Sequence, residues 1–406
     1  MKETYCLPLT AATNKLHLGN LYSWILADSY KRASKVLDKD VEIRESWNCF
    51  SKRLEDEISS RFLLFGEKLV CKCEENIEGN ITLAQDIFHK YGIHSSNPVI
   101  RDDSPEYKEV VIKDYERRNK NGEIKNFFLK IPNPREILRK AEGVHFYPKS
   151  ALNSLKGIST LEGVLSVPIL RKGEYGIGIN GIKDMVLGQR YVQSLLPEFY
   201  RQSLGVPELA IFGKDVLAKW VYFMIANSDS IPFNNLGLHG LILKKEGGKI
   251  SKYDPYVPLI KDIDSHPDNV RLSLLKQTFG LDFKSPNFGD EEKFRRKIEN
   301  CLNFFVNYQP PREVNDGHNF EFEIDRTSRE ISNKIRALNF SGAYQDFKSL
   351  TYNKVSSDTI PFIKNRGISQ ESFGKIISGF SKVSKVFAPI TAEEKLSQNP
   401  NYSIFR

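Results

Sequence analysis

The chain has 406 residues, of which 40% are hydrophobic and 27% are charged, a composition typical of globular proteins with two or three domains. No apolar run reaches the roughly 18 residues that a membrane-spanning helix needs. The opening residues, Met1 to Thr4, lack the pattern of a signal peptide. We therefore expect a cytoplasmic protein with no membrane partner.

The formal net charge of +8 favours a polyanionic partner. Its distribution is uneven, because the stretch from Ile331 to Arg406 carries 11 Lys and Arg residues against 5 Asp and Glu residues. This excess is consistent with a nucleic-acid partner bound at the C-terminal region. A solvated basic face explains it equally well.

The five cysteines are scattered, which does not indicate a disulfide framework. Cys71 and Cys73 form the one closely spaced pair, and no second pair or nearby histidine accompanies them. Structural zinc needs four ligands, so we expect no metal centre and no zinc.

Apolar runs and helical patterns alternate over residues 1–68. The order is a strand at Thr4–Leu9, a helix at Leu21–Val36, a strand at Val41–Ser46 and a helix at Ser51–Phe65. It predicts a parallel sheet with crossover helices, the first half of a Rossmann-type domain. Ligands bind such sheets at the carboxyl ends of the strands, so we expect His17 and Trp47-Asn48 to face one crevice.

The pattern becomes irregular over residues 69–183, which we interpret as a connective insertion. It contains charged helices at Ile81–Tyr91 and Pro105–Lys120 and a glycine-rich segment at Gly173–Gly181. Alternation resumes over residues 184–269, the expected second half of the nucleotide-binding domain. The elements expected there are a helix at Leu187–Leu204, a strand at Glu208–Phe212, a helix at Val216–Asn227 and a strand at Leu236–Leu243.

Residues 270–406 show apolar spacings of three and four throughout, which predicts a helical domain. The expected helices are Val270–Phe279, Glu291–Tyr308, Arg326–Leu338, Ala343–Leu350 and Gln370–Lys385. The fold class predicted for the whole chain is therefore α/β, with a Rossmann-type parallel sheet interrupted by an insertion and followed by an all-α bundle.

The stretch from Lys15 to Asn20 connects the first strand to the first helix. A helix N-terminus opened through Gly19, with an imidazole at His17 and a carboxamide at Asn20, directs N–H groups to one point and suits a phosphate. A turn glycine beside a satisfied loop histidine is the alternative interpretation. A second such stretch, Gly247–Lys252, sets lysines on both sides of a hydroxyl, and two phosphate-type stretches in one fold favour nucleotide binding.

Taken together, these stretches resemble the signatures of the class I aminoacyl-tRNA synthetases, in the subgroup of the methionyl, leucyl, isoleucyl, valyl and cysteinyl enzymes. His17-Leu18-Gly19-Asn20 is similar to that family's H-I-G-N signature, and Lys249-Ile250-Ser251-Lys252 is similar to its K-M-S-K-S loop. Further similar phrases are Phe212–Val216, Leu238–Leu243, Ile87–Ile93, Arg101–Pro105 and Val386–Glu394. The chain thus resembles a short, divergent, methionyl-like member over most of its length.

The resemblance implies that the protein activates an amino acid with ATP and transfers the aminoacyl group to tRNA. It implies that the C-terminal helical domain binds the tRNA and that Mg²⁺ is carried with ATP. Activation needs donors for the charge that builds on phosphate oxygens, and a mobile lysine loop can clamp the leaving pyrophosphate. By resemblance, the catalytic residues are His17, Asn20, Lys249, Ser251 and Lys252, and those that bind ATP are Gly19, Gly213, Asp215, His239 and Gly240.

The amino-acid pocket carries the main departures from the family. By resemblance it is formed by Leu7, Trp47, Asn48, Gln189 and Arg190. Relatives have an aspartate where this chain has Asn48, so the expected charge contact with the α-ammonium group is weakened. Asn48 can instead form an Asx turn. Gln189 or Arg190 can read a polar or acidic side chain, or Arg190 can simply lie on a helix surface.

Three functions remain open on the sequence. The first is an aminoacyl-tRNA synthetase or close paralogue, favoured by the basic C-terminal region. The second keeps the adenylation chemistry but transfers the amino acid to a small-molecule amine or hydroxyl, favoured by the altered pocket. The third is a non-catalytic tRNA-binding module, against which the retention of both Lys249 and Lys252 argues.

Overall fold

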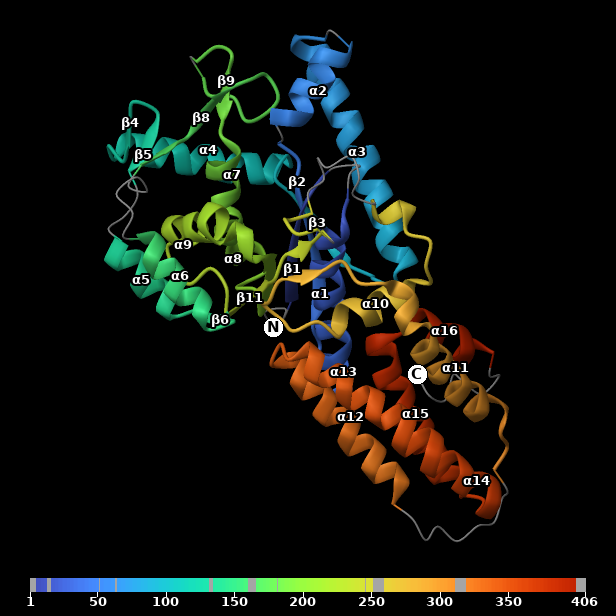
Figure 1. Cartoon of the computed structure of the whole chain (residues 1–406). Helices are drawn as coiled ribbons and strands as arrows, with labels where there is room; N and C mark the ends of the chain where they lie inside the picture. Colours follow the sequence, from blue (N-terminus) through green and yellow to red (C-terminus); the bar gives the residue numbers. More distant parts are fainter. Residues whose placement is uncertain are drawn as a thin grey trace. The chain divides into compact units, whose positions relative to one another are not determined.

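The chain forms two compact units, each with its own internal arrangement (Figure 1). The first comprises Met1–Leu16, Glu42–Asp86 and Ser95–Leu241, and the second comprises His17–Val41, Ile87–His94 and Ile242–Arg406. The computed structural model describes residues 5–12, 16–50, 52–62, 64–130, 134–159, 166–180, 182–244, 246–250, 259–310 and 319–398. Within these residues no helix has the length and apolar character needed to cross a bilayer.

The first unit is organised around a six-stranded, wholly parallel sheet in the order β3-β2-β1-β10-β11-β6. Its strands are β1 (Tyr5–Ala11), β2 (Glu42–Asn48), β3 (Ser96–Arg101), β6 (His145–Tyr147), β10 (Leu209–Gly213) and β11 (Asn235–His239). The apolar run of β10 is buried as far as Phe212, as expected for a parallel strand covered on both faces. The predicted α/β fold class is confirmed.

Two strands of this sheet, β3 and β6, come from the range 69–183 that the sequence suggested as an insertion. The domain boundaries drawn from the sequence stay a prediction. Strand order reverses direction between β1 and β10, and that reversal defines the switch point at which α/β sheets bind ligands.

The first unit also carries helices and small antiparallel sheets around the main sheet. The helices are α2 (Lys52–Phe62), α3 (Gly66–Lys90, whose last turn belongs to the second unit), α4 (Pro105–Lys120), α5 (Pro134–Glu142), α6 (Ser150–Ser159), α7 (Gln189–Ser194), α8 (Leu196–Ser203) and α9 (Tyr222–Asn227). The small strands are β4 (Ile124–Lys125), β5 (Phe128–Lys130), β7 (Ser166–Pro168), β8 (Leu170–Lys172) and β9 (Met185–Leu187).

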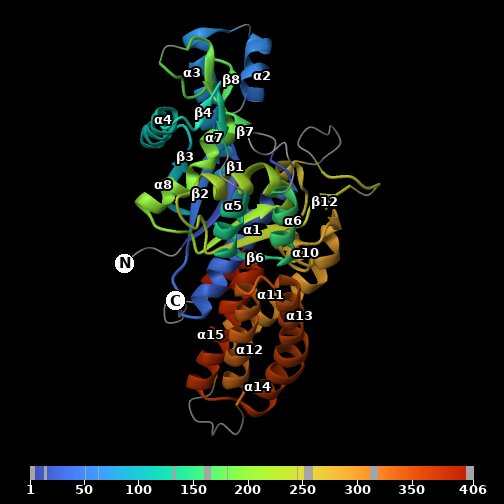
Figure 2. The ribbon, with the colours of Figure 1, turned by 90° about the vertical axis from the view of Figure 1, so that its left-hand side faces the viewer.

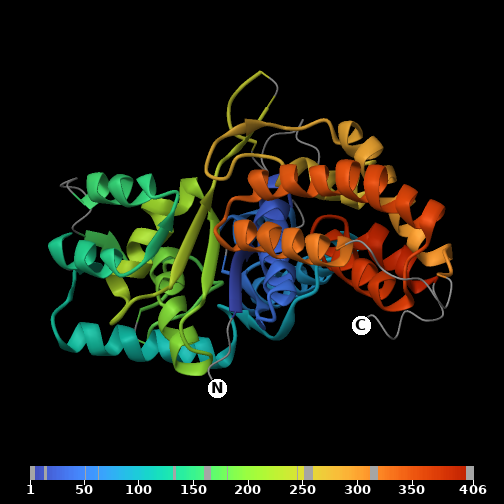
Figure 3. The same ribbon diagram turned by 90° about the horizontal axis from the view of Figure 1, so that it is seen from below.

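The second unit is helical and includes the first helix of the chain. Its elements are α1 (Leu18–Val36), β12 (Ile242–Leu243), α10 (Pro267–Leu275), β13 (Phe283–Lys284), α11 (Glu292–Asn307), α12 (Phe320–Arg336), α13 (Phe340–Ser349), α14 (Ile360–Arg366), α15 (Gln370–Phe387) and α16 (Pro389–Ser397). Figures 2 and 3 show α12, α13 and α15 as neighbouring rods, in agreement with their packing. A π-helical stretch, Leu350–Thr359, joins α13 to α14.

A buried arginine fastens α1 to this unit. Arg271 of α10 is wholly buried and donates hydrogen bonds to Asp28 Oδ2 at 2.7 Å, to the Tyr91 carbonyl at 3.3 Å and to the Val386 carbonyl at 3.1 Å. These partners lie on α1, after α3 and on α15. The opposite charge of Asp28, itself 2% exposed, offsets the cost of burying the guanidinium.

Local interruptions explain where the predicted elements differ from the observed ones. The predicted helix Leu187–Leu204 divides into β9, α7 and α8, because Pro197 begins a new helix at its N-terminus. The predicted strand Leu236–Leu243 divides at Gly240 into β11 and β12. The region predicted to be wholly helical contains β13, which pairs with β12.

Candidate functional site

The N-terminus of α1, in the second unit, is closed by a reciprocal cap. His17 Nδ1 accepts a hydrogen bond from the Gly19 N–H at 3.0 Å, and Asn20 Oδ1 accepts one from the His17 N–H at 3.2 Å. Because Nδ1 is the acceptor, a neutral His17 ring carries its proton on Nε2. The cap therefore fixes the imidazole as an N–H donor beside a helix N-terminus whose first turn carries no acidic residue.

Position 19 has no room for a side chain, so only glycine fits there without a shift of its neighbours. A Cβ at this position would lie 2.9 Å from His17 Cε1 and 3.1 Å from its Nδ1. The imidazole therefore lies directly over the Gly19 backbone, and any side chain would displace the ring or break the cap.

The lysine stretch begins as a tight hairpin in the same unit. Leu243 of β12 forms an antiparallel β-bridge with Lys249. In addition, the Ile250 N–H donates a hydrogen bond to the Ile242 carbonyl at 3.0 Å. Gly247 and Gly248, at φ values of 100° and 80°, form the turn, a conformation that favours glycine. Ile250 is buried and Lys249 is exposed, so the hairpin is anchored by its isoleucine and presents its lysine to solvent.

The chain returns from the lysine stretch to the α1 cap. Leu259 forms an antiparallel bridge with His17. Ser251 and Lys252 lie outside the described residues, between Ile250 and Leu259. The structure thus brings Leu259 to His17, while the placement of Lys252 relative to His17 stays a prediction.

The other candidate ATP residues gather in the first unit at the end of β10. Gly213 pairs with His239 of β11, and a Cβ on Gly213 would meet Asp215 Oδ1 at 2.8 Å and His239 Cε1 at 3.5 Å. His239 is buried, and its Nδ1 lies 2.8 Å from the Gly240 carbonyl oxygen. A carbonyl can only accept, so Nδ1 carries a proton and Nε2 of the neutral ring is an acceptor.

The candidate amino-acid residues are distributed over three elements of the first unit. Leu7 lies on β1, paired with Ala210 of β10, and its side chain is not among those described. Trp47 is wholly buried, and its indole N–H donates to the buried Glu45 at 2.9 Å. Asn48 ends β2, is 9% exposed, and its Oδ1 has no hydrogen-bond partner within the described residues.

Gln189 and Arg190 open α7, where Gln189 is half-buried and Arg190 is exposed. One turn further along, the wholly buried Gln193 donates from Nε2 to Asp102 Oδ2 at 3.2 Å. The sequence reasoning did not single out Gln193. The helical spacing of four from Gln189 was the signal that could have found it.

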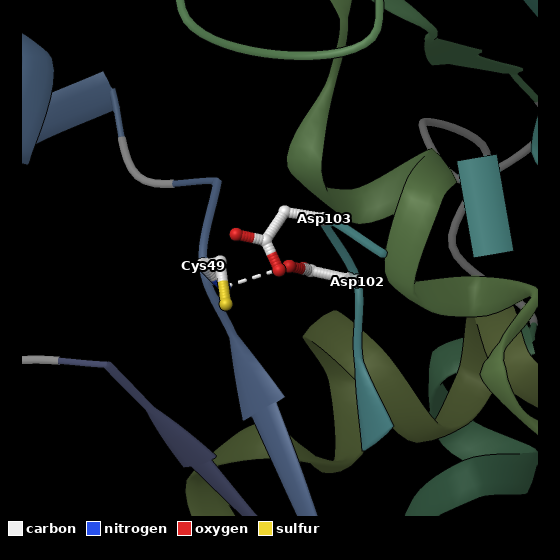
Figure 4. Close-up of side chains that lie close together, drawn as sticks. All are labelled: Cys49, Asp102 and Asp103. Atoms are coloured by element: carbon white, nitrogen blue, oxygen red, sulfur yellow. Dashed lines mark hydrogen bonds between the residues drawn. The ribbon is translucent and has the colours of Figure 1, made fainter. Parts of the chain in front are cut away.

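Cys49, Asp102 and Asp103 cluster where β2 and β3 end (Figure 4). Burial raises the pKa of Asp102 to about 7, although hydrogen bonds from backbone N–H groups and Gln193 oppose the rise. Burial, together with the neighbouring carboxylates, also raises the pKa of the Cys49 thiol. Burial opposes ionisation of Asp103 too, but the paired Arg101 outweighs it and holds the pKa of Asp103 below its ordinary value.

The structure therefore assembles the predicted site residues in two groups. His17, Gly19, Asn20 and Lys249 belong to the second unit, and Gly213, Asp215, His239 and Gly240 belong to the first with the candidate amino-acid residues. The expectation that His17 and Asn48 face one crevice stays a prediction. The roles assigned to all of these residues are likewise proposals.

Comparison with solved structures identifies the fold. The chain is similar to Mycobacterium tuberculosis methionyl-tRNA synthetase bound by methionyl-adenylate, with a TM-score of 0.74 and 13% identity over 99% of this chain and 95% of the other. It is also similar to the Agrobacterium radiobacter K84 agnB2 leucyl enzyme in a ternary complex with tRNA and LeuAMS. That match has a TM-score of 0.71 and 11% identity, and it covers 98% of this chain and 85% of the other.

The apo form of the Mycobacterium tuberculosis methionyl enzyme also matches, with a TM-score of 0.64 and 12% identity over 99% of this chain and 93% of the other. No protein-family model and no curated protein matches the sequence. The chain has the fold of the class I aminoacyl-tRNA synthetases, and the resemblance drawn from the sequence is confirmed at that level.

Proposed function

We propose that the chain activates an amino acid with ATP to give an aminoacyl adenylate and transfers the aminoacyl group to tRNA. The observation that carries the proposal is the cap in the second unit, where His17 and Asn20 fix an imidazole N–H donor at the N-terminus of α1. The exposed Lys249 belongs to the same unit. The fold of the chain supports this chemistry.

The proposed chemistry is an in-line displacement. A carboxylate oxygen of the amino acid bonds to the α-phosphorus of ATP, and the bond to the pyrophosphate oxygen breaks. Negative charge grows on the phosphate oxygens, and preorganised donors stabilise it. His17 Nε2–H would supply such a donor at the positive end of the α1 dipole, while Lys249 and Lys252 would hold the leaving pyrophosphate. Because ATP carries Mg²⁺ on its phosphates, few protein carboxylates are needed.

Gly213 lies between two polar side chains. A Cβ there would be 2.8 Å from Asp215 Oδ1 and 3.5 Å from His239 Cε1, so a glycine lets these two groups, which could read a ribose or a base, keep their positions. We assign Gly213, Asp215, His239 and Gly240 to the ATP site on this basis. The hydrogen bond to the Gly240 carbonyl fixes the orientation and the tautomer of the His239 ring.

Asn48 is the central residue of the proposed amino-acid pocket. Its buried Oδ1 has no hydrogen-bond partner within the described residues, and a ligand ammonium group would supply one. A neutral carboxamide attracts an ammonium group less strongly than a carboxylate does. Leu7, Trp47, Gln189 and Arg190 complete the proposed pocket.

A basic groove in the helical unit supports tRNA as the acceptor. It has a volume of about 390 Å³ and is lined by Lys297 and Asn300 of α11 and by Lys364 of α14, among others. The Lys364 ammonium group lies 5.5 Å from the centre of the Phe304 ring, which also lines the groove. Lysines beside an aromatic face are the elements with which single-stranded nucleic acid is bound.

The first test is exchange of labelled pyrophosphate into ATP with each proteinogenic amino acid in turn. We expect one amino acid to support exchange and Lys252→Ala and His17→Ala to lose nearly all of it. A folded protein with no exchange for any amino acid would overturn the adenylation proposal and favour a tRNA-binding module.

The second test measures tRNA affinity against salt concentration. Phosphate contacts give a linear fall of log affinity with log salt, and each lost contact reduces the slope by about 1. Lys297→Ala and Lys364→Ala should each do so, whereas Lys375→Ala, which removes an exposed lysine paired with Glu371, should not. Exchange without tRNA binding at any salt would favour a small-molecule amine or hydroxyl as acceptor.

A further inference from the structure

The cluster at the ends of β2 and β3 has the donor set of a metal site. One ligand atom from each of Cys49, Asp102 and Asp103 lies within 4.8 Å of the others, and Figure 4 shows the Cys49 thiol directed at the Asp103 carboxylate. Sheet register creates this proximity, because Trp47 of β2 pairs with Arg101 of β3. Cys49 lies two residues after Trp47, and Asp102 and Asp103 follow Arg101, so all three lie just beyond the ends of the two strands.

The electrostatics of the cluster leave one buried acid without a charged partner of its own. Arg101 pairs with both oxygens of Asp103, at 2.8 Å each. Within the described residues, the hydrogen-bond donors to Asp102 are neutral, namely the Cys49 N–H at 2.7 Å, the Phe50 N–H and the Gln193 amide at 3.2 Å. A wholly buried carboxylate beside a second carboxylate is costly unless a cation compensates it.

An independent observation points to a ligand. Gln193 is 0% exposed and its Nε2 contacts Asp102, yet its Oε1 has no hydrogen-bond partner within the described residues. The unpartnered oxygen thus belongs to a buried side chain whose other polar atom contacts the cluster. Buried polar atoms are nearly always satisfied, and a carboxamide oxygen can coordinate a cation.

We propose that Cys49, Asp102 and Asp103 bind one divalent transition-metal ion, with zinc as the best fit, and that Gln193 Oε1 or a water completes the coordination. A thiolate ligand selects zinc over magnesium or calcium, and zinc accepts mixed sulfur and oxygen ligands in a tetrahedral arrangement. On binding, the Sγ–H bond is replaced by an Sγ–metal bond and the proton passes to solvent. The ion would tie the ends of β2 and β3 together beside Asn48.

This site differs from the one that the sequence considered and set aside. Cys71 and Cys73 suggested a C-x-C pair, whereas the cluster joins residues 53 positions apart, a separation that no sequence spacing pattern covers. The proposal does not depend on the proposed function, because metal binding is measured without ATP or an amino acid.

The test is metal content and Co²⁺ spectroscopy on the full chain. Protein treated with EDTA should take up one equivalent of Zn²⁺, and Co²⁺ should give a thiolate-to-cobalt charge-transfer band in the near ultraviolet. Cys49→Ser should abolish the band, and Asp102→Asn should lower Zn²⁺ affinity at least tenfold. Cys71→Ser, at an exposed cysteine of α3, should retain both properties.

Two results would overturn the proposal. Folded wild-type protein that shows no charge-transfer band and no stoichiometric Zn²⁺ uptake has no site here. A band that persists in Cys49→Ser and disappears in Cys71→Ser places the metal elsewhere. If Cys49→Ser does not fold, as judged by circular dichroism, the measurements on the wild type and on Cys71→Ser still show whether the protein binds the metal and whether Cys71 is a ligand.

Discussion

Two histidines at the candidate ATP residues are held in opposite tautomers, and each lies in a different unit. His17 accepts a hydrogen bond at Nδ1 from Gly19, so its neutral ring presents an N–H. His239 donates from Nδ1 to the Gly240 carbonyl, so its neutral ring presents a lone pair. The first arrangement suits an anion and the second suits a donor, as phosphate and nucleoside would require. The local backbone thus holds one amino-acid type in two different tautomers.

The largest expected effect comes from a variant that keeps the helix cap at residue 17 but removes the imidazole N–H donor. Asparagine caps helices well, so His17→Asn should keep the α1 N-terminus but lose the Nε2–H donor. We expect pyrophosphate exchange to fall about 100-fold or more, the cost of removing one preorganised donor, with stability to urea changed by under about 1 kcal/mol. Unchanged exchange would show that His17 serves only as a cap.

A second change tests the space over Gly19. In Gly19→Ala the new Cβ would lie 2.9 Å from His17 Cε1, so the ring must move, and we expect exchange to fall at least about tenfold. Gly79→Ala is the control, because nothing lies within 4 Å of an added Cβ there. On the exposed face of α3 it should stabilise the protein by about 0.5–1 kcal/mol. Equal activity of the two variants would contradict the assignment.

The nucleoside half should respond differently. Gly213→Ala places a Cβ 2.8 Å from Asp215 Oδ1, and we expect the KM for ATP to rise about tenfold with little change in kcat, the signature of lost uniform binding. Gly157→Ala, where an added Cβ meets nothing within 4 Å, should leave both constants unchanged. A fall in kcat alone would indicate that Gly213 contributes to the chemical step and not to ATP binding.

The smallest expected effect concerns the stability of the helical unit. Hydrogen bonds from Arg295, Asn269 and Arg296 hold the pKa of Glu292 well below its ordinary value. A depressed carboxyl pKa stabilises the fold above the unfolded value near 4.5, and this stabilisation is lost as pH falls below it. Because Glu292 is about one-third exposed, Glu292→Gln should cost under about 1 kcal/mol at pH 7.

The Glu292→Gln penalty should shrink at pH 3, as measured by urea unfolding at both pH values. Glu371→Gln, in an exposed pair with Lys375, is the matched control and should cost less at pH 7. A penalty that is the same at both pH values would mean that the carboxylate charge does not stabilise the unit.

Local chemistry made parts of the fold predictable. The helix Pro105–Lys120 was predicted with the bounds it has, because Ser104 caps it, Pro105 starts it and Asn121-Gly122 ends it. The α1 cap was recognisable for the same reason, since His17, Gly19 and Asn20 lie within four residues. Such features depend on contacts between near neighbours in sequence, and a sequence displays those directly.

Features that depend on strand pairing were not predictable. β6 joins the edge of the sheet by pairing with β11, about 90 residues later in the chain. The proximity of Cys49, Asp102 and Gln193 arises in the same way, from register and from one turn of α7. No local pattern links these residues, so the sequence offered only the pair Cys71 and Cys73 for consideration, and that pair was set aside.

The buried Arg271 determines how the chain could be divided into fragments. A cut after residue 269, where the sequence pattern changes to helices, would separate Arg271 from Asp28 of α1. The N-terminal piece would retain Asp28 with Arg32 as its ion-pair partner at 2.9 Å, whereas the C-terminal piece would hold Arg271 without the carboxylate of Asp28. Removing one partner of a buried ion pair costs about 3–5 kcal/mol, so the polypeptide should resist dissection at that point.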